Sequence, residues 1–316
     1  MVPPSAAGIL AAARLIAPHA TPAPLVRSLL LSSDHGCELF VKNETVSPIA
    51  SFKWRGALTA VLRAEEVRRG VVTSSTGNHG QGVAWAASVA GVPAHIFLPE
   101  NANRVKRRKI ELLGATIHQQ AGDLDSVKEQ AIRWARDQRL LFIDDGESAD
   151  VIEGAGTVGL EIAAALHDID LLFVPMGSGS LAAGVAIAVK DRHPHARVVA
   201  VQSDGAPAMV ESFRAGAPVE RSADTVADGL ICRVPARLAL DSLLAHVDEA
   251  MTATDVAILA AGREMAERAH ILVEPSGAAG LAAARMRGDL AGKRVIIVAT
   301  GANVTAGVMG RMFCER

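Results

Sequence analysis

Short runs of Val, Ile and Leu alternate along the chain with Ala-rich segments whose apolar residues recur at helical spacing. This alternation predicts β–α units around mostly parallel sheets, because a strand covered by helices on both faces is apolar along its whole length. Strands are predicted over residues 38–42, 70–73, 94–98, 116–118, 140–143, 171–175, 198–202 and 294–299. Helices are predicted over residues 5–16, 52–68, 78–89, 104–113, 124–137, 156–166, 179–190, 206–213, 253–269 and 277–285.

The length of 316 residues is enough for about two domains. Strand–helix units follow one another without interruption between residues 66 and 147. We therefore predict a small domain over residues 66–147 and a discontinuous large domain built from residues 1–65 and 148–316. Ligands of such sheets bind beyond the carboxyl ends of the strands, so the strand-to-helix turns are the places to look for chemistry.

Composition excludes several classes of function. Lys plus Arg number 32 and Asp plus Glu 34, and this balance provides no attraction to nucleic acid or to an anionic membrane. Aromatic residues make up 3% and Tyr is absent, so the chain offers few stacking platforms for single-stranded nucleic acid. No apolar run is long enough for a membrane-spanning helix, and the N-terminal segment lacks the basic region of a secretory signal.

Cysteine and histidine spacing argues against disulfide and metal frameworks. Cys37, Cys232 and Cys314 are scattered, which is typical of a protein from a reducing compartment. The 10 His residues show none of the paired spacings of metal ligands. We expect a soluble cytoplasmic protein without a metal site.

The first turn of interest reads Ser-Phe-Lys-Trp-Arg-Gly-Ala over residues 51–57. Ser51 is predicted to cap the helix that runs to Arg68, which places Lys53 in the first helical turn. A cation is disfavoured there by the helix dipole, so the lysine breaks a local rule in the way that active-site residues often do. The alternative is an ordinary lysine that extends into solvent.

The second turn, Thr-Ser-Ser-Thr-Gly-Asn-His-Gly-Gln-Gly over residues 73–82, follows a predicted strand and opens a helix. Its hydroxyls, its glycines and the side chain of Asn78 suit a carboxylate or another anion bound at a helix N-terminus. Such residues also favour ordinary capped turns.

The third turn, Met-Gly-Ser-Gly-Ser-Leu over residues 176–181, joins an apolar strand to an Ala-rich helix and predicts a phosphate cradle. Alone it also fits a relaxed dinucleotide-binding pattern, with Gly177, Gly179, Ala182 and then Asp204.

Two further turns, Glu-Pro-Ser-Gly-Ala over residues 274–278 and Ala-Thr-Gly-Ala-Asn over residues 299–303, are unremarkable by themselves. The basic run Arg-Val-Lys-Arg-Arg-Lys over residues 104–109 is predicted to form a solvated helix face.

Taken in order, these five motifs resemble those of the fold-type II pyridoxal-phosphate enzymes, and most closely the serine/threonine dehydratases (ammonia-lyases) and serine racemases. The segment Ile-Glu-Gly-Ala-Gly-Thr-Val-Gly-Leu-Glu over residues 152–161 is also similar to that subgroup, and the likeness runs from about Thr21 to Val304. The resemblance implies a two-domain α/β fold of the tryptophan synthase β type, with mostly parallel sheets flanked by helices. It also implies pyridoxal 5′-phosphate as the cofactor and a homodimer as the assembly.

The resemblance assigns roles residue by residue. Lys53 would form the Schiff base and remove the Cα proton, and Asn78 would bond the cofactor's 3′-hydroxyl. Thr300 would meet the pyridine nitrogen. The implied cofactor contacts are Phe52, Lys53, Asn78, Gly177, Ser178, Gly179, Ser180, Leu181, Glu274 and Thr300. The implied contacts to the substrate carboxylate are Ser75, Thr76, Asn78 and His79.

Several positions depart from the family's usual pattern. Ser178 and Ser180 stand where the phosphate loop usually has glycines, and their hydroxyls would add bonds to the phosphate. Gln202 and Ala208 stand where metal-dependent members carry carboxylate ligands, so we expect that divalent site to be absent. Thr76, the candidate second acid/base, stands where serine racemases have a serine, which disfavours racemisation.

The implied reaction is α,β-elimination from a small β-hydroxy amino acid such as threonine or serine, which gives a 2-oxo acid and ammonia. One alternative is a serine-type racemase. Another is a β-replacement synthase, whose loop usually reads Asn-Thr rather than Asn78-His79. A nicotinamide-dependent dehydrogenase or a nucleotide binder would leave Lys53 and the turn around Asn78 unexplained. The identity of the β-hydroxy amino acid stays open.

Overall fold

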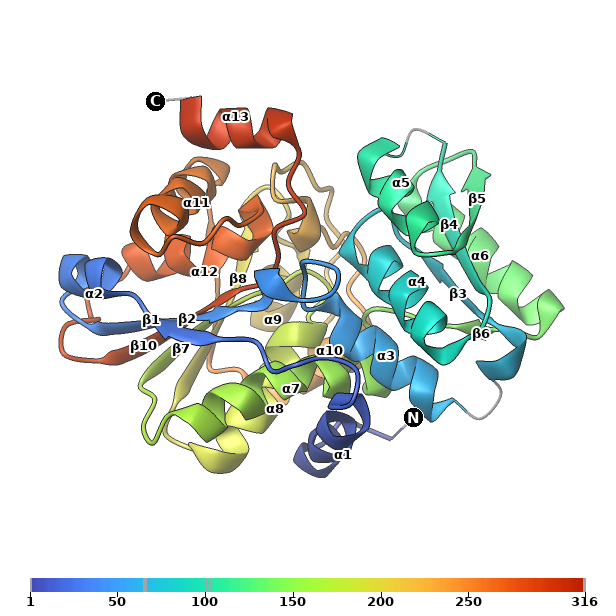
Figure 1. Ribbon diagram of the computed structural model, residues 1–316. Helices are drawn as coiled ribbons and strands as arrows, with labels where there is room; N and C mark the ends of the chain where they lie inside the picture. The colour runs from blue at the N-terminus through green and yellow to red at the C-terminus, as the bar shows by residue number, and fades with distance from the viewer. Residues whose placement is uncertain (1, 65–66, 101, 103, 315–316) are drawn as a thin grey trace.

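The computed structural model describes residues 2–64, 67–100, 102 and 104–314, which form two sheets with helices on their faces (Figure 1). The larger sheet has the strand order β1-β2-β10-β7-β8-β9, and only the β1–β2 pair in it is antiparallel. The smaller sheet has the order β5-β4-β3-β6 and is parallel throughout. The α/β class with mostly parallel sheets is therefore confirmed.

The strands of the larger sheet are β1 (Leu25–Arg27), β2 (Glu38–Asn43), β7 (Leu171–Pro175), β8 (Arg197–Ser203), β9 (Glu249–Ala253) and β10 (Arg294–Ala299). Those of the smaller sheet are β3 (Val71–Ser74), β4 (Ala94–Pro99), β5 (Thr116–Gln120) and β6 (Leu141–Phe142).

The helices of the first half are α1 (Ala6–Ile16), α2 (Leu29–His35), η1 (Glu44–Val46), α3 (Lys53–Arg63), η2 (Val67–Arg69), α4 (Asn78–Ala90), α5 (Arg104–Leu112) and α6 (Leu124–Gln138). Those of the second half are α7 (Ala149–Ala165), α8 (Ser180–Arg192), α9 (Ala208–Ala215), η3 (Asp228–Leu230), α10 (Arg237–His246), α11 (Asp255–Arg268), α12 (Pro275–Arg285) and α13 (Ala306–Cys314). Within the described residues, every helix is too short or too polar to cross a bilayer.

Burial on both faces explains why the central strands read as continuous apolar runs. Leu172 and Val174 of β7 pack on the side of α1, α7, α8 and α10, whereas Leu171 and Phe173 pack on the side of α2, α11 and α12. In the smaller sheet, α4 and α5 cover one face and α6 covers the other. Helix α3 packs against both α4 and α7, and so joins the two halves of the molecule.

The structure differs from the predicted elements mainly where local signals are weak. Strand β1 is short and mostly exposed, and β9 and helices α2, α10 and α13 were also not predicted. The helix predicted over residues 52–68 ends at Arg63. Helix α7 begins at Ala149, seven residues before the predicted start at Gly156, and Ser148 caps it by accepting a bond from Val151 N.

Glycines inside α7 weaken its helical signal and yet are needed for packing. A Cβ atom on Gly154 would lie 2.5 Å from the carbonyl oxygen of Arg55 in α3. One on Gly156 would lie 2.8 Å from the carbonyl oxygen of Gly184 in α8. The three helices therefore approach one another through their backbones, and the residues that permit this contact have poor intrinsic helix propensity.

A buried charge network fixes the position of α3. Arg55 is 1% exposed, and its guanidinium donates to both carboxylate oxygens of Glu44, at 2.9 and 3.0 Å. It also donates to Thr157, at 2.9 Å, and to Glu161, at 2.6 and 3.0 Å. Lys42 of β2 also contacts Glu161. The network joins α3 to β2, η1 and α7, two residues after Lys53.

Replacement of Arg55 by Met should destabilise the protein strongly. The substitution leaves Glu44 buried without its cation, so we expect the free energy of unfolding to fall by about 3–5 kcal/mol. Urea unfolding followed by circular dichroism measures the change. Arg133→Met is the control, because Arg133 pairs with Glu129 on an exposed helix face and should contribute less than about 1 kcal/mol. Similar small losses in both variants would show that the network is not needed.

Candidate active site

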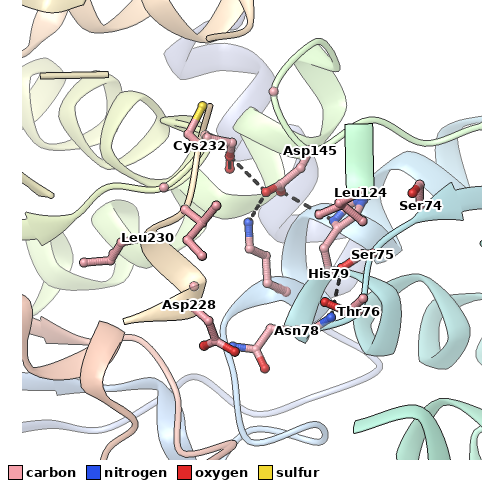
Figure 2. Close-up of a pocket in the computed structure, with 18 of the residues that line it drawn as sticks. Ser74, Ser75, Thr76, Asn78, His79, Leu124, Asp145, Asp228, Leu230 and Cys232 are labelled. Carbon is pink, nitrogen blue, oxygen red and sulfur yellow. Dashed lines mark hydrogen bonds and ion pairs between the residues drawn. The ribbon is translucent and has the colours of Figure 1, made fainter. Parts of the chain in front are cut away.

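A cavity of about 770 Å³ lies between the two sheets. Its walls include the turns after β3, β6, β7 and β10 and the start of α3. Figure 2 shows Ser75, Asn78 and Asp145 among the side chains that line it. The structure brings every predicted site residue to this cavity, namely Phe52, Lys53, Ser75, Thr76, Asn78, His79, Gly177, Ser178, Gly179, Ser180, Leu181, Glu274 and Thr300. These residues come from five separate segments of the chain.

The turn before α8 forms a cradle of backbone donors. The N–H groups of residues 177–181 donate to no acceptor within the described part of the chain. Gly179 has φ +96°, and its helix end has no side-chain cap. A Cβ atom on Gly177 would lie 2.5 Å from the carbonyl oxygen of Gly229, so the loop requires glycine at this position. Free N–H groups at a helix N-terminus favour a bound anion such as phosphate.

A second helix start faces the same cavity. Helix α4 begins at Asn78, and Gly77 in the N-cap position offers no side-chain bond. Ser75 Oγ accepts a bond from Gly77 N, at 3.2 Å, and shapes the turn. The N–H groups of residues 78–80 have no acceptor among the described residues. The cavity therefore has two anion-binding ends, which suits a ligand with two separate negative groups.

Lys53 is the first residue of α3, and its ammonium nitrogen contacts Asp145. The prediction that Ser51 caps this helix is wrong. Phe52 occupies the N-cap position and makes no side-chain cap bond, while Ser51 pairs with Gly301 across an isolated bridge. The backbone N–H of Phe52 donates to the carbonyl oxygen of Thr300, at 3.0 Å. Ser51 Oγ still accepts a bond from Lys53 N, at 3.4 Å, so this side chain and the residue after β10 together position the start of α3.

Asp145, which the sequence reasoning missed, lies at the centre of the polar contacts. Ser178 Oγ donates to Asp145 Oδ2, at 2.9 Å. His79 Nδ1 lies 3.4 Å from Asp145 Oδ1 (Figure 2). Burial alone would raise the pKa of Asp145, but the adjacent Lys53 ammonium and His79 lower it below its usual range. The signal was present in the sequence, since Asp144 and Asp145 directly follow a predicted strand.

Asn78 belongs to a line of side-chain hydrogen bonds along the cavity wall. Its Nδ2 donates to Glu274 Oε1, at 2.6 Å, and its Oδ1 accepts from Asn303 Nδ2, at 2.7 Å. Asn303 Oδ1 in turn accepts from Lys109 Nζ, at 2.6 Å. The carboxylate and the ammonium at the two ends fix which side of each amide donates, so that the Asn78 amide has a defined orientation.

The prediction that residues 104–109 form a solvated helix face is wrong for Lys106, whose side chain is 14% exposed, whereas Lys109 is exposed as predicted but also has a tertiary partner. Lys106 contacts Asp228 at the cavity, and Lys109 bonds Asn303. Helix α5 carries both lysines across to η3 and the segment after β10. Periodicity shows only that this face is polar, and it cannot show which tertiary partner lies opposite.

The side-chain amide of Gln202 is hydrogen-bonded to backbone groups of the fold. Its Oε1 accepts from Met209 N, at 3.1 Å, and from Val210 N, at 3.2 Å, at the start of α9. Its Nε2 donates to the carbonyl oxygen of Leu230, at 3.2 Å. The side chain therefore caps a helix rather than offering a free ligand. Among the described residues, no three His, Cys, Asp or Glu side chains gather in a way that would hold a metal ion.

Similarity to known proteins agrees with this geometry. Residues 16–301 match the family described as pyridoxal-phosphate dependent enzyme. The chain is 36% identical over 291 residues to the L-threonine ammonia-lyase of Thermotoga maritima, covering 91% of this chain and 73% of the relative. It is 30% identical to the L-threo-3-hydroxyaspartate ammonia-lyase of Saccharomyces cerevisiae, covering 96% and 94%. The structure of maize serine racemase superimposes with a TM-score of 0.93 at 32% identity, covering 98% and 97%.

Glu274 should make stability depend on pH. Burial, with Asp228 nearby, raises the pKa of Glu274 from 4.5 to about 7. Between these values the folded chain holds a proton that the unfolded chain releases, so the free energy of unfolding falls as pH rises. We expect cofactor-free wild type to lose about 3 kcal/mol relative to Glu274→Gln between pH 5 and pH 8.

Urea unfolding at several pH values measures this difference. Glu129→Gln, at a side chain that is 73% exposed, is the control for loss of a carboxylate and should follow wild type. A constant difference between wild type and Glu274→Gln across the pH range would contradict the raised pKa.

Proposed function

Because the chain belongs to the family of pyridoxal-phosphate dependent enzymes, we propose that it dehydrates and deaminates a β-hydroxy amino acid such as threonine or serine. The products are a 2-oxo acid and ammonia. The observation that carries this proposal is the position of Lys53, which begins α3 in a cavity with a free helix N-terminus at each of two turns. The ammonia-lyase names of its relatives support the same activity.

The residues present fit pyridoxal 5′-phosphate. The uncommitted N–H groups of residues 177–181 would hold its phosphate, and Lys53 would form the Schiff base. Asn78 and Glu274 would contact its ring substituents, and Thr300 would offer a hydroxyl to the pyridine nitrogen. When bound, the cofactor supplies the electron sink for the carbanion at Cα.

The chain's own groups then have separate tasks. Lys53 removes the Cα proton, and residues 75–79 bind the substrate carboxylate at the start of α4. Burial lowers the pKa of His79, and the neutral ring keeps its Nε2–H directed at the carbonyl oxygen of Ile143, at 3.2 Å. Thr300 carries no charge, so it would not favour protonation of a pyridine nitrogen bound beside it, and expulsion of the β-hydroxyl would then compete with return of the proton to Cα.

A serine-type racemase is the second candidate. The maize serine racemase structure is closely similar over nearly the whole chain, and Thr76 places a hydroxyl in the cavity where a second acid/base would act. Elimination and racemisation share the first proton removal, and they differ in whether the β-hydroxyl leaves or Cα is reprotonated on its other face. The ratio of 2-oxo acid to D-enantiomer separates the two activities.

A substrate panel tests the proposal. The purified protein, loaded with pyridoxal 5′-phosphate, is incubated with L-serine, L-threonine, L-threo-3-hydroxyaspartate and a 3-aryl-L-serine. We expect at least one of them to give 2-oxo acid and ammonia in equal amounts. Chiral chromatography of the remaining substrate measures racemisation. D-enantiomer without 2-oxo acid across the panel would replace elimination by racemisation as the function.

The Lys53→Ala variant is the matched arm of this experiment. Loss of the amine should abolish the visible absorbance of the bound cofactor and lower the elimination rate by about 10³-fold, with circular dichroism unchanged. Lys128→Ala removes another lysine of the same cavity, which pairs with Asp144, and should keep the absorbance. Retention of the absorbance in Lys53→Ala would assign the Schiff base to a different lysine.

We also propose a cytoplasmic homodimer, with residues 66–147 as a small domain and residues 1–65 and 148–316 as the large one. The smaller sheet, built wholly from strands within residues 71–142, supports this division. Three exposed apolar side chains, Val26, Leu29 and Leu30, lie close together in the sequence around β1 and α2 and support an association surface there. Light scattering of wild type and Leu29→Asp tests it, and a monomeric wild type would contradict the dimer.

A further inference from the structure

We propose that Asp145 is a catalytic acid, which protonates the β-hydroxyl as it leaves the substrate and recovers its proton from Lys53. This inference rests on the proposed function. It assigns the proton donor for the leaving hydroxyl, a role that Lys53 and the carboxylate-binding residues do not fill. Hydroxide is a poor leaving group, so its departure requires a proton donor close to the β-carbon.

The contacts of Asp145 place it beside Lys53, the group to which we assign removal of the Cα proton. Its carboxylate touches the nitrogen of Lys53, and its Oδ2 accepts a bond from Ser178 in the loop of residues 177–181. The group that removes the Cα proton must reach Cα, and the β-oxygen is two bonds from Cα. A carboxyl group in contact with Lys53 Nζ therefore lies within reach of the β-oxygen.

The inner oxygen of Asp145 shows why this carboxyl can hold a proton. His79 Nε2 faces the Ile143 carbonyl oxygen, which only accepts, so in the neutral ring the hydrogen is on Nε2. His79 Nδ1 then presents a lone pair to Asp145 Oδ1, at 3.4 Å. Both atoms are buried, and neither has a hydrogen-bond partner among the described residues. Two facing acceptors are stabilised when the pair takes up a proton.

The charge of Lys53 determines whether Asp145 is protonated. While Lys53 is an ammonium, it keeps Asp145 ionised. Once the lysine nitrogen is a neutral amine, that opposing charge is gone, and burial and the His79 lone pair both favour the protonated carboxyl. The other charged or titratable groups around Asp145 are Lys128, Asp144 and Cys232.

The proton balance closes without a further reactant. Lys53 takes the proton from Cα as that bond breaks. Asp145 gives its own proton to the β-oxygen as the Cβ–O bond breaks, and water is released. The Lys53 nitrogen must lose this proton before it can act as an amine again, and the Asp145 carboxylate in contact with it accepts the proton, so that both groups regain their starting states.

The test compares two substrates that give the same product. L-Serine and β-chloro-L-alanine both yield pyruvate and ammonia, but chloride leaves without a proton. In Asp145→Asn, which keeps the size of the side chain, we expect kcat/KM for serine to fall by about 10²-fold and that for β-chloroalanine to stay within about threefold. In deuterium oxide, the variant should still exchange the Cα hydrogen of serine, as seen by NMR of recovered serine.

A measurement on the cofactor-free protein checks the pair directly. The carboxylate of Asp145 raises the pKa of His79 against the effect of burial. We therefore expect an NMR titration of the His79 ring, assigned with His79→Gln, to shift to lower pH in Asp145→Asn. An unshifted titration would contradict the facing arrangement of the two side chains.

Asp144→Asn is the matched control, because it removes the same charge one residue earlier. Asp144 bonds Gly146 N, Glu147 N and Lys128. Its loss should change both substrates by the same factor. Equal losses for serine and β-chloroalanine in Asp145→Asn, or no loss for either, would overturn the acid role. Failure of wild type to dehydrate any hydroxy amino acid would instead overturn the proposed function.

Discussion

The position of Lys53 depends on a charge that is buried two residues away. Arg55 is enclosed by carboxylates from η1 and α7 and holds α3 against these two elements. A buried ion pair of this kind contributes little net stability compared with an apolar core, but it strongly penalises any other arrangement of its partners. Here the alternative arrangements are those in which α3 rotates or slides, and each would move Lys53 relative to the two anion-binding helix starts. The main effect of the network is therefore to select one position of α3, rather than to add to the free energy of unfolding.

The cavity is assembled from backbone groups that the fold leaves without partners. The starts of α4 and α8 both lack side-chain caps, and Gly179 adopts a conformation that L-residues rarely take. Each feature weakens the cofactor-free protein slightly and prepares a site for an anion. Glu274 also has a cost in stability, because its carboxyl group is buried in the cavity wall and its pKa is raised. The binding groups are thus fixed in place before any ligand arrives.

The sequence predicts this architecture well where a residue or a short run is compatible with only one kind of local structure. The apolar runs of β7 and β10 match the observed strands to the residue, because burial on both faces leaves no other pattern. The turns after β3 and β7 are predicted for the same reason, since hydroxyls and glycines at a strand-to-helix junction suit few other purposes. Asp145 and Lys109 were not found, because an acidic residue in a turn and a lysine on a helix acquire their meaning only from partners distant in the sequence. Helix α7 was placed too late because its glycines reduce local helix propensity while they serve contacts with α3 and α8.

The glycine contacts between α3, α7 and α8 also limit how this protein can be engineered for heat resistance. Replacing a helical glycine by alanine commonly raises the melting temperature, because it restricts the unfolded chain. At Gly156 the added carbon would lie 2.6 Å from the side chain of Ile9 and 2.8 Å from the backbone of α8, so the same replacement would force apart the helices that hold the cavity. Gly307 and Gly310 of α13 have no atom within 4 Å of such a carbon. Glycine-to-alanine replacements that raise the melting temperature are therefore expected in α13 and not at the glycines where α7 meets α3 and α8.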